Sequence, residues 1–240
     1  MKEIFISFLI IAVVSVSAAR AHTADLCSQH PQDSLKSEQL IIVLTDSWNS
    51  IRATLYGVEK IRNNWVIQFS FPVVLGHKGI AIDKSEGDLK SPAGIFHLGP
   101  AFGYANKKEV SWIRIPYICA SDTLICVDDA GSHFYNQLID SNSSPKDWHS
   151  HEEMHRKDNA YAWGLFVQYN VKPVAKGKGS CIFLHIWEND HEGTAGCTAM
   201  EESNLLKLLR WIQADKNPQL MQYPIAEYKK VAAGYKLPDL

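Results

Sequence analysis

The feature that most constrains the fold is a succession of short segments rich in β-branched and aromatic residues. Three of them, at residues 39–45, 51–60 and 65–76, are separated by turn-forming Asp, Ser, Asn and Gly. This pattern predicts three consecutive strands, which short connections would pair in antiparallel fashion. A turn with a short strand is expected at 91–99, and further strands are expected at 110–118, 163–170 and 180–187. The chain is therefore predicted to be mainly β.

Helix signals are fewer. Residues 201–213 carry acids in the first turn and apolar residues at helical spacing, which predicts one amphipathic helix. A short closing helix is expected at 225–234, and a polar helical insertion is expected at 145–159. We expect these few helices to lie at the periphery of the β fold.

The N-terminal segment has the organisation of a secretory signal. Lys2 is followed by an uncharged run from Ile4 to Ala19 and by a small-x-small triplet that ends at Ala21. We therefore expect residues 1–21 to be a signal peptide, with a retained membrane anchor as the alternative. The segments expected after it are an N-terminal arm at 22–38, one domain at 39–230 and a C-terminal tail at 231–240.

The composition fits an exported globular protein. Of the 240 residues, 46% are hydrophobic and 21% are charged, and no second apolar stretch approaches the roughly 18 residues of a membrane helix. We therefore expect no stable membrane insertion once the signal is cleaved. The 24 Lys and Arg residues against 26 Asp and Glu argue against a broad nucleic-acid-binding surface.

Export makes the cysteines informative, because thiols outside the cytosol tend to be oxidised. Beyond the signal the chain has an odd number of them, so at least one is unpaired or bonds between molecules. The short loop between Cys119 and Cys126 favours a bond there, although Cys27, Cys119, Cys126 and Cys181 allow three connectivities and the sequence does not choose among them. We expect Cys197 to be the free thiol and Cys181 to serve structure.

One stretch, residues 180–211, places reactive groups in order. A buried strand ends at His185, and Gly196-Cys197 precedes the amphipathic helix. A thiol gains nucleophilicity from an adjacent imidazole, and a nearby cation or the positive end of a helix would lower its pKa. Glycines at 193 and 196 would let backbone amides converge on a developing oxyanion. The arrangement predicts acyl transfer through a thioester.

These residues resemble a known family. The chain is similar to the L,D-transpeptidase (YkuD-type) catalytic domain of bacterial cell-wall enzymes. The similarity rests on the upstream histidine followed by Gly-Cys, on the segment Lys90-Ser91-Pro92-Ala93-Gly94-Ile95-Phe96 and on the VVLG sequence at 73–76. The similarity extends from about residue 40 to about residue 227.

The resemblance implies a β-sandwich-like fold and a set of roles. Cys197 matches the nucleophile and His185 the base, while the main-chain carbonyl of Ile186 orients the imidazole. The amides of Gly196 and Cys197 match the oxyanion donors. The implied substrates and partners are peptidoglycan stem peptides, cross-linked 3-to-3 with release of D-alanine in the periplasm or cell wall, without a metal or organic cofactor.

The sequence also departs from the family pattern. In the run Thr194-Ala195-Gly196-Cys197-Thr198-Ala199, Ala195 replaces a second histidine and Ala199 replaces an arginine assigned to substrate carboxylate contact. His191 is a candidate auxiliary base, and Arg114 and Arg156 are candidates for the carboxylate. These departures keep three alternatives open: an L,D-carboxypeptidase, an amidase of the same fold, or a wall-binding module without activity.

The segment His151-Glu152-Glu153-Met154-His155 matches the H-E-x-x-H pattern of zinc peptidases. On a helix its two imidazoles would share one face, with Glu152 as base. Its polar flanks would not supply the dry site that zinc hydrolysis uses, so we favour a solvated helix and no metal site.

Three aromatic residues are candidates for a peptide-binding groove, although buried aromatic residues more often belong to the core. They are Tyr135, Trp163 and Trp187.

Overall fold

The computed structural model describes residues 35–240. The expected signal peptide and most of the expected N-terminal arm, together with Cys27, lie outside the described residues. None of the helices in the described part of the chain is long and apolar enough to cross a membrane.

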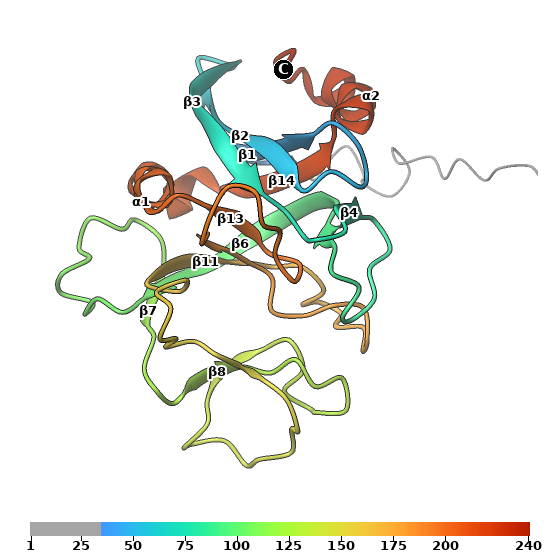
Figure 1. The fold of residues 1–240 in the computed structure, drawn as a ribbon. Helices are drawn as coiled ribbons and strands as arrows, with labels where there is room; N and C mark the ends of the chain where they lie inside the picture. The colour runs from blue at the N-terminus through green and yellow to red at the C-terminus, as the bar shows by residue number, and fades with distance from the viewer. Residues whose placement is uncertain (1–34) are drawn as a thin grey trace, which may run out of the picture. The chain divides into compact units, whose positions relative to one another are not determined.

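The centre of the fold is a sheet of nine strands (Figure 1). Strand β11 pairs with β12 on one side and with β6 on the other, so the sheet closes into a barrel-like form. The prediction of a mainly β fold with a few helices is confirmed. In spatial order the strands are β11 (Trp163–Val167), β12 (Phe183–Ile186), β13 (Thr198–Met200), β3 (Asn64–Val74), β2 (Arg52–Ile61), β1 (Gln39–Thr45), β14 (Gln219–Pro224), β6 (Gly94–Gly103) and β7 (Tyr117–Cys119).

The three N-terminal strands lie where the sequence predicts them. Every residue of β1 is buried, because it pairs with β2 in antiparallel and with β14 in parallel fashion. Such a central strand is expected to be a continuous apolar run, as QLIIVLT nearly is. Strands β2 and β3 form a long hairpin whose register shifts between Gly57 and Val58.

Two α-helices occur in the described residues, and both match their predictions. Helix α1 (Glu202–Trp211) buries Leu205, Leu208 and Leu209 and packs against β11 and β12. Helix α2 (Ile225–Tyr235) packs against β14 and β1 and continues past the expected start of the C-terminal tail at 231. A short 3-10 helix, Ala214–Lys216, follows α1.

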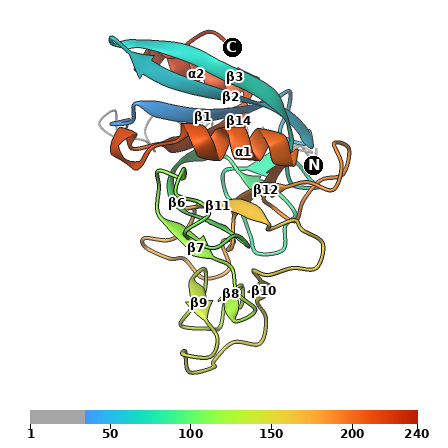
Figure 2. The ribbon, with the colours of Figure 1, turned by 90° about the vertical axis from the view of Figure 1, so that its left-hand side faces the viewer.

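A separate ribbon of three short strands lies away from the large sheet (Figures 1 and 2). It consists of β8 (Leu124–Cys126), β9 (Leu138–Asp140) and β10 (Glu152–Glu153), and a further pair, β4 (Ile80–Ala81) with β5 (Ser91–Pro92), stands beside the large sheet.

The prediction of a helix at 145–159 is wrong, because part of this segment pairs with β8 as strand β10. The segment is held by specific contacts instead of by an apolar helical face. The Asp147 carboxylate accepts hydrogen bonds from Ser132 Oγ and the His133 amide, and Trp148 is buried beside Ile125 and Val127.

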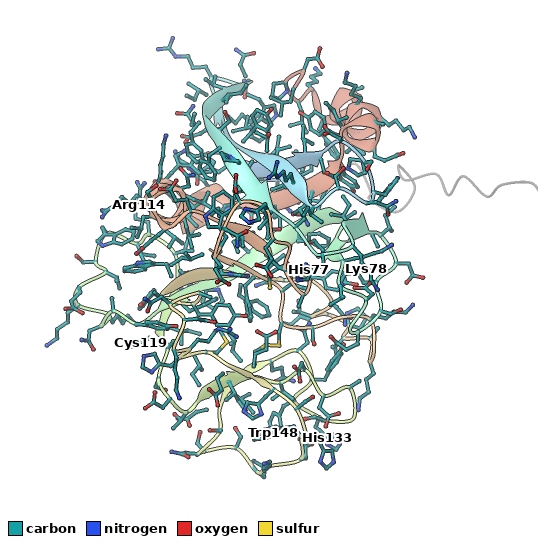
Figure 3. All side chains as sticks on the ribbon, viewed as in Figure 1. His77, Lys78, Arg114, Cys119, His133 and Trp148 are labelled. Atoms are coloured by element: carbon teal, nitrogen blue, oxygen red, sulfur yellow. A yellow bond between two sulfur atoms is a disulfide. The ribbon has the colours of Figure 1, made fainter. Side chains whose placement is uncertain are left out.

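The expected Cys119–Cys126 bond is also wrong. Cys126, at the end of β8, is bonded to Cys181, which fits the expected structural role of Cys181. Cys119 ends β7 on the large sheet, where its thiol is exposed and free (Figure 3). The two cysteines are close in sequence but belong to different sheets. Cys197 is free and buried, as expected.

A strand at 110–118 is not formed as predicted, because only Tyr117–Cys119 is extended. Of the residues before it, Trp112 packs against helix α1, and Arg114 forms one isolated parallel bridge with Gln213. Trp112 stacks under the Arg210 guanidinium, 4.1 Å from the ring centroid, and lies beside Trp163. Arg114 donates to the carbonyl of Arg210 at the end of α1.

Candidate active site

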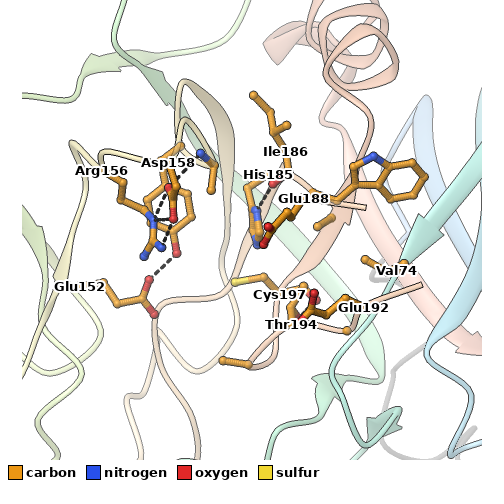
Figure 4. Close-up of a pocket in the computed structure, with 16 residues that line it drawn as sticks. Val74, Glu152, Arg156, Asp158, His185, Ile186, Glu188, Glu192, Thr194 and Cys197 are labelled. Carbon is orange, nitrogen blue, oxygen red and sulfur yellow. Dashed lines mark hydrogen bonds and ion pairs between the residues drawn. The ribbon is translucent and has the colours of Figure 1, made fainter. Parts of the chain in front are cut away.

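A cavity of about 480 Å³ opens between the end of β12 and the start of β13 (Figure 4). One wall comes from the loop that leads from β10 to β11, and the other comes from β12, β13 and the loop between them. The residues that line it are Val74, Glu152, Arg156, Asp158, Ala160, Tyr161, His185, Ile186, Trp187, Glu188, Glu192, Gly193, Thr194, Ala195, Cys197 and Ala199.

The sheet fixes His185 at the edge of this cavity. His185 pairs with Gly164 of β11 on one side and Ala199 of β13 on the other. Position 164 takes glycine because a Cβ there would lie 2.1 Å from the ring of Phe102. His185 Nδ1 lies 2.8 Å from the carbonyl oxygen of Ile186, which leaves Nε2 for proton exchange. This is the orienting contact that the family resemblance implies.

The Cys197 thiol contacts the backbone at the start of strand β12. The Phe183 amide donates to Sγ at 3.3 Å, and the thiol donates to the Cys181 carbonyl at 3.5 Å. Figure 4 shows the sulfur directed into the space between His185 and Glu152. The structure therefore brings the expected nucleophile and base to one cavity.

The two sequence motifs meet at the backbone of Cys197. Ser91 Oγ donates to the Cys197 carbonyl at 2.9 Å and accepts the Gly76 amide. Thr194 Oγ1 donates to the same carbonyl at 2.6 Å. The segment around Ser91 therefore holds the backbone of the distant Gly196-Cys197 pair in place. The sequence motif alone does not show this contact.

The protonation states differ from the sequence-based expectation. Burial raises the pKa of the Cys197 thiol, and the nearby charge of Glu152 adds to this effect. Burial also lowers the pKa of His185 to about 4. The expected help from a helix end is missing, because β13 separates Cys197 from Glu202, where α1 begins. At neutral pH the resting pair is therefore thiol and neutral imidazole.

A buried cation, which sequence reasoning missed, lies behind the nucleophile. Lys84 is 3% exposed and donates to Asp88 Oδ1 at 2.5 Å and to the Lys90 carbonyl. A Cβ built on Gly196 would lie 3.6 Å from Lys84 Nζ. The charge of Lys84 opposes the rise in the Cys197 pKa and so favours a developing thiolate. An isolated lysine in a polar loop gives no signal of this in the sequence.

The two expected oxyanion donors differ in this structure. The Gly196 amide donates to Thr194 Oγ1 at 3.1 Å. No acceptor for the Cys197 amide is present among residues 35–240. The Cys197 amide is therefore the better placed of the two to receive an oxyanion.

The other candidate residues separate into two groups. Trp187 and Arg156 line the cavity. Trp163 and Tyr135 do not line it. Trp163 donates through Nε1 to Glu202, and buried Tyr135 donates to Glu86. His191 is exposed, outside the lining, and bonded to Asp190.

Arg114 also lies away from the cavity, on the outer surface (Figure 3). Of the two arginines considered for a substrate carboxylate, only Arg156 is at the site. Arg156 forms an ion pair with Asp158 and lies 5.1 Å from the centroid of the Tyr161 ring. The pairing lowers the pKa of Asp158 to about 2.

The H-E-x-x-H segment does not form a zinc-peptidase helix. His155 contacts Asp122 through Nδ1 at 2.5 Å, and neither His151 nor His155 lines the cavity. Within residues 35–240 no group of three or more His, Cys, Asp or Glu side chains is arranged to hold a metal ion. Only Glu152 of this motif reaches the cavity, in a setting that the zinc pattern does not predict.

Comparison with known proteins agrees with the sequence motifs. Residues 49–225 match the family model YkuD, described as the L,D-transpeptidase catalytic domain. No curated protein matches the chain.

Among solved structures, the structure of Bdellovibrio bacteriovorus Bd1075 matches with 13% sequence identity and a TM-score of 0.41. The match covers 78% of this chain and 48% of that one, so the chain spans about half the length of the protein it matches. Because the family model covers most of the sequence, from just before β2 to the start of α2, the chain belongs to the L,D-transpeptidase catalytic domain family.

Proposed function

We propose that this chain is an exported cysteine acyltransferase that acts on peptidoglycan stem peptides in the periplasm or cell wall, as an L,D-transpeptidase. The observation that carries the proposal is the shared cavity. It holds a free thiol and an imidazole whose Nδ1 contacts a backbone carbonyl, so Nε2 is the nitrogen left to act as base.

The first half-reaction acylates Cys197. As Sγ attacks the carbonyl between the third residue and the terminal D-alanine of a tetrapeptide stem, His185 Nε2 takes the thiol proton. Because both groups are neutral at rest, we expect this transfer to accompany attack instead of preceding it. The oxyanion is received by the Cys197 amide, and the imidazolium then gives its proton to the departing D-alanine amine.

The second half-reaction resolves the thioester. As an amine of a second stem attacks the carbonyl, His185 Nε2 takes a proton from it. The C–S bond then breaks with its electron pair going to sulfur, and His185 gives that proton to sulfur. The product is a 3-to-3 cross-link. No metal or organic cofactor is needed for either half-reaction.

Arg156 is the candidate for the donor's terminal carboxylate. Among the residues that line the cavity it is the one Lys or Arg. It comes from a different segment than Ala199, the position at which the common family pattern has its arginine. A guanidinium can pair with a carboxylate in bidentate fashion, and Asp158 holds it in place until substrate arrives.

Hydrolysis of the same thioester is the second candidate, and one observation favours it. Ala195 and Ala199, the two departures from the family pattern, both line the cavity. Water would then complete an L,D-carboxypeptidase or amidase reaction in place of an amine.

Mass analysis tests both candidates. The mature protein is incubated with tetrapeptide muropeptide, and protein and products are weighed. A thioester adduct with dimeric products supports transfer, whereas an adduct with only shortened monomers supports hydrolysis. Absence of any adduct contradicts the proposed acyl transfer. Unchanged wall binding by a Cys197→Ala variant, with no turnover by the parent protein, would instead indicate a wall-binding module.

A further inference from the structure

A carboxyl group faces the nucleophile from the wall opposite the sheet. Glu152 and Tyr161 both line the cavity that holds Cys197, and the Tyr161 hydroxyl donates to Glu152 Oε2 (Figure 4). The Tyr161 ring also packs edge-on against His185, with 5.3 Å between centroids. The same tyrosine therefore contacts both His185 and the carboxyl group of Glu152.

A disulfide links the ribbon that carries Glu152 to the backbone just before β12, which contacts the nucleophile. Glu152 in β10 pairs with Cys126 in β8, and Cys126 is bonded to Cys181. The Cys181 carbonyl accepts the hydrogen bond from the Cys197 thiol. The disulfide thus holds the ribbon that carries Glu152 next to the backbone that contacts Cys197.

One oxygen of Glu152 remains available. Within residues 35–240, the hydrogen bond from Tyr161 is the one that the Glu152 side chain makes, and it occupies Oε2. Oε1 therefore has no partner in the described part of the chain, and Glu152 lines the cavity. A donor group of a bound molecule would find an acceptor there.

The surroundings of Glu152 make its carboxyl group hold a proton more tightly than an exposed glutamate does. Burial raises its pKa, and the charges of Asp128 and Glu86 act in the same direction. The hydrogen bond from Tyr161 and the charge of Arg156 oppose the rise. A carboxyl group with a raised pKa in a cavity beside a nucleophile is the pattern that active-site bases show.

The proton count of the second half-reaction calls for such a group. A protonated amine must lose two protons to become an amide nitrogen. One of them reaches Sγ through His185, which cannot hold the other at the same time. The cavity is also acidic, because Glu152, Asp158, Glu188 and Glu192 outnumber Arg156 among its lining residues. Such a lining attracts an ammonium group.

We propose that Glu152 is a second catalytic base of this site, which takes a proton from the ammonium group of the acceptor when the Cys197 thioester is resolved. The proposal rests on the proposed function. The Glu152 carboxylate takes one proton and becomes a carboxylic acid, and the neutral amine attacks the thioester carbon. His185 passes the second amine proton to sulfur as the C–S bond breaks, and Glu152 then loses its proton to water.

Step-resolved kinetics of Glu152→Gln test this. Formation of the thioester with tetrapeptide is followed by intact mass, and its decay is followed after addition of an amine-bearing acceptor stem. We expect adduct formation within about threefold of the parent protein and aminolysis slower by about 10²-fold. Glu153→Gln, at the exposed neighbouring position of β10, is the matched control and should leave both rates unchanged.

The outcomes separate the two proposals. A parent protein that forms no adduct overturns the proposed function. A parent protein that forms the adduct while Glu152→Gln aminolyses it at the parental rate overturns only the role of Glu152. An equal loss of the rates of adduct formation and aminolysis also overturns the role of Glu152. That result would mean that Glu152 only supports the structure of the site.

A second measurement is available should Glu152→Gln fail to fold. Tyr161→Phe keeps the ring against His185 but removes the hydrogen bond that lowers the Glu152 pKa. The Glu152 pKa should then rise, so the acidic limb of the aminolysis rate should move to higher pH. The other groups near Glu152, namely Asp128, Glu86, Arg156 and Cys197, are unchanged in this variant. An acidic limb that stays in place contradicts the proposal.

Discussion

The large sheet and the segment between β7 and β11 contribute opposite walls of one cavity, yet they are held by different means. The sheet forms from long runs of apolar residues. His185 lies on β12, and Cys197 lies just before β13. The other segment has short strands, a disulfide and single polar contacts, and it delivers Glu152, Arg156 and Tyr161. The comparison teaches that the residues of the recognised sequence motif lie on or beside the regular part of the fold. The irregular part adds cavity residues that this motif does not contain.

The largest effect is expected on the sheet side. Cys197→Ala removes the nucleophile and should abolish adduct formation, and His185→Ala should lower turnover by about 10²–10⁴-fold because the base is lost. Product analysis by mass measures both. His191→Ala is the matched control and should cost less than about threefold, because His191 is exposed and outside the cavity lining. Comparable losses for both histidines would break the assignment of His185.

The second prediction addresses how the ribbon is attached. Replacing Cys126 and Cys181 by Ala should destabilise the protein by about 2–4 kcal/mol, since the bond closes a loop across 55 positions in sequence. Urea unfolding measures this. Cys119→Ala, which removes an exposed free thiol, should leave the midpoint unchanged. An unchanged midpoint for the double variant would mean that the ribbon unfolds independently of the sheet.

The third prediction concerns pH. His185 must be neutral to take the thiol proton, and its pKa of about 4 places the acidic limb of acylation near pH 4. Burial is the main cause of the lowered pKa, and the hydrogen bond with the Ile186 carbonyl opposes it. The charge of Arg156 acts with burial and that of Asp158 acts against it. At pH 5 acylation should therefore exceed by about 30-fold the value expected for an imidazole of ordinary pKa near 6.5. Rates of adduct formation between pH 3.5 and 8 check this, and a limb near 6.5 would contradict it.

The smallest effect is expected at Arg156. Arg156→Ala should raise KM for the tetrapeptide donor by about tenfold with a smaller change in kcat, because a carboxylate contact in a partly solvated cavity contributes about 1.4 kcal/mol. Lys157→Ala, at the exposed neighbouring position, is the control. A KM equal to that of the parent protein would assign Arg156 to holding Asp158 and the wall in place.

The same contrast explains what sequence reasoning reached. Sequence patterns predict the strands at 39–76 and helix α1, because regular structure repeats its signal over many residues. The order of the motif predicts that His185 and Cys197 line one cavity. The segments at 110–118 and 145–159 do not. Their shape depends on single contacts, such as Trp112 with Arg210 and Cys126 with Cys181, that no local pattern encodes.

Within the site, the limits are equally physical. The raised pKa of Cys197 arises from burial and from Glu152, which lies far from it in sequence. The anchoring of the Cys197 carbonyl by Ser91 joins positions 106 apart in the chain. Electrostatic environment and long-range hydrogen bonds of this kind become visible only once the chain is folded.

The Cys126–Cys181 bond has a consequence for the timing of activity on the proposed export route. On that route a precursor in the reducing cytosol would keep both sulfurs as thiols, so the wall that bears Glu152 would lack its disulfide there. Oxidation after translocation would complete that wall. Maturation of the catalyst would thereby be coupled to arrival in the compartment where cell-wall strands are found.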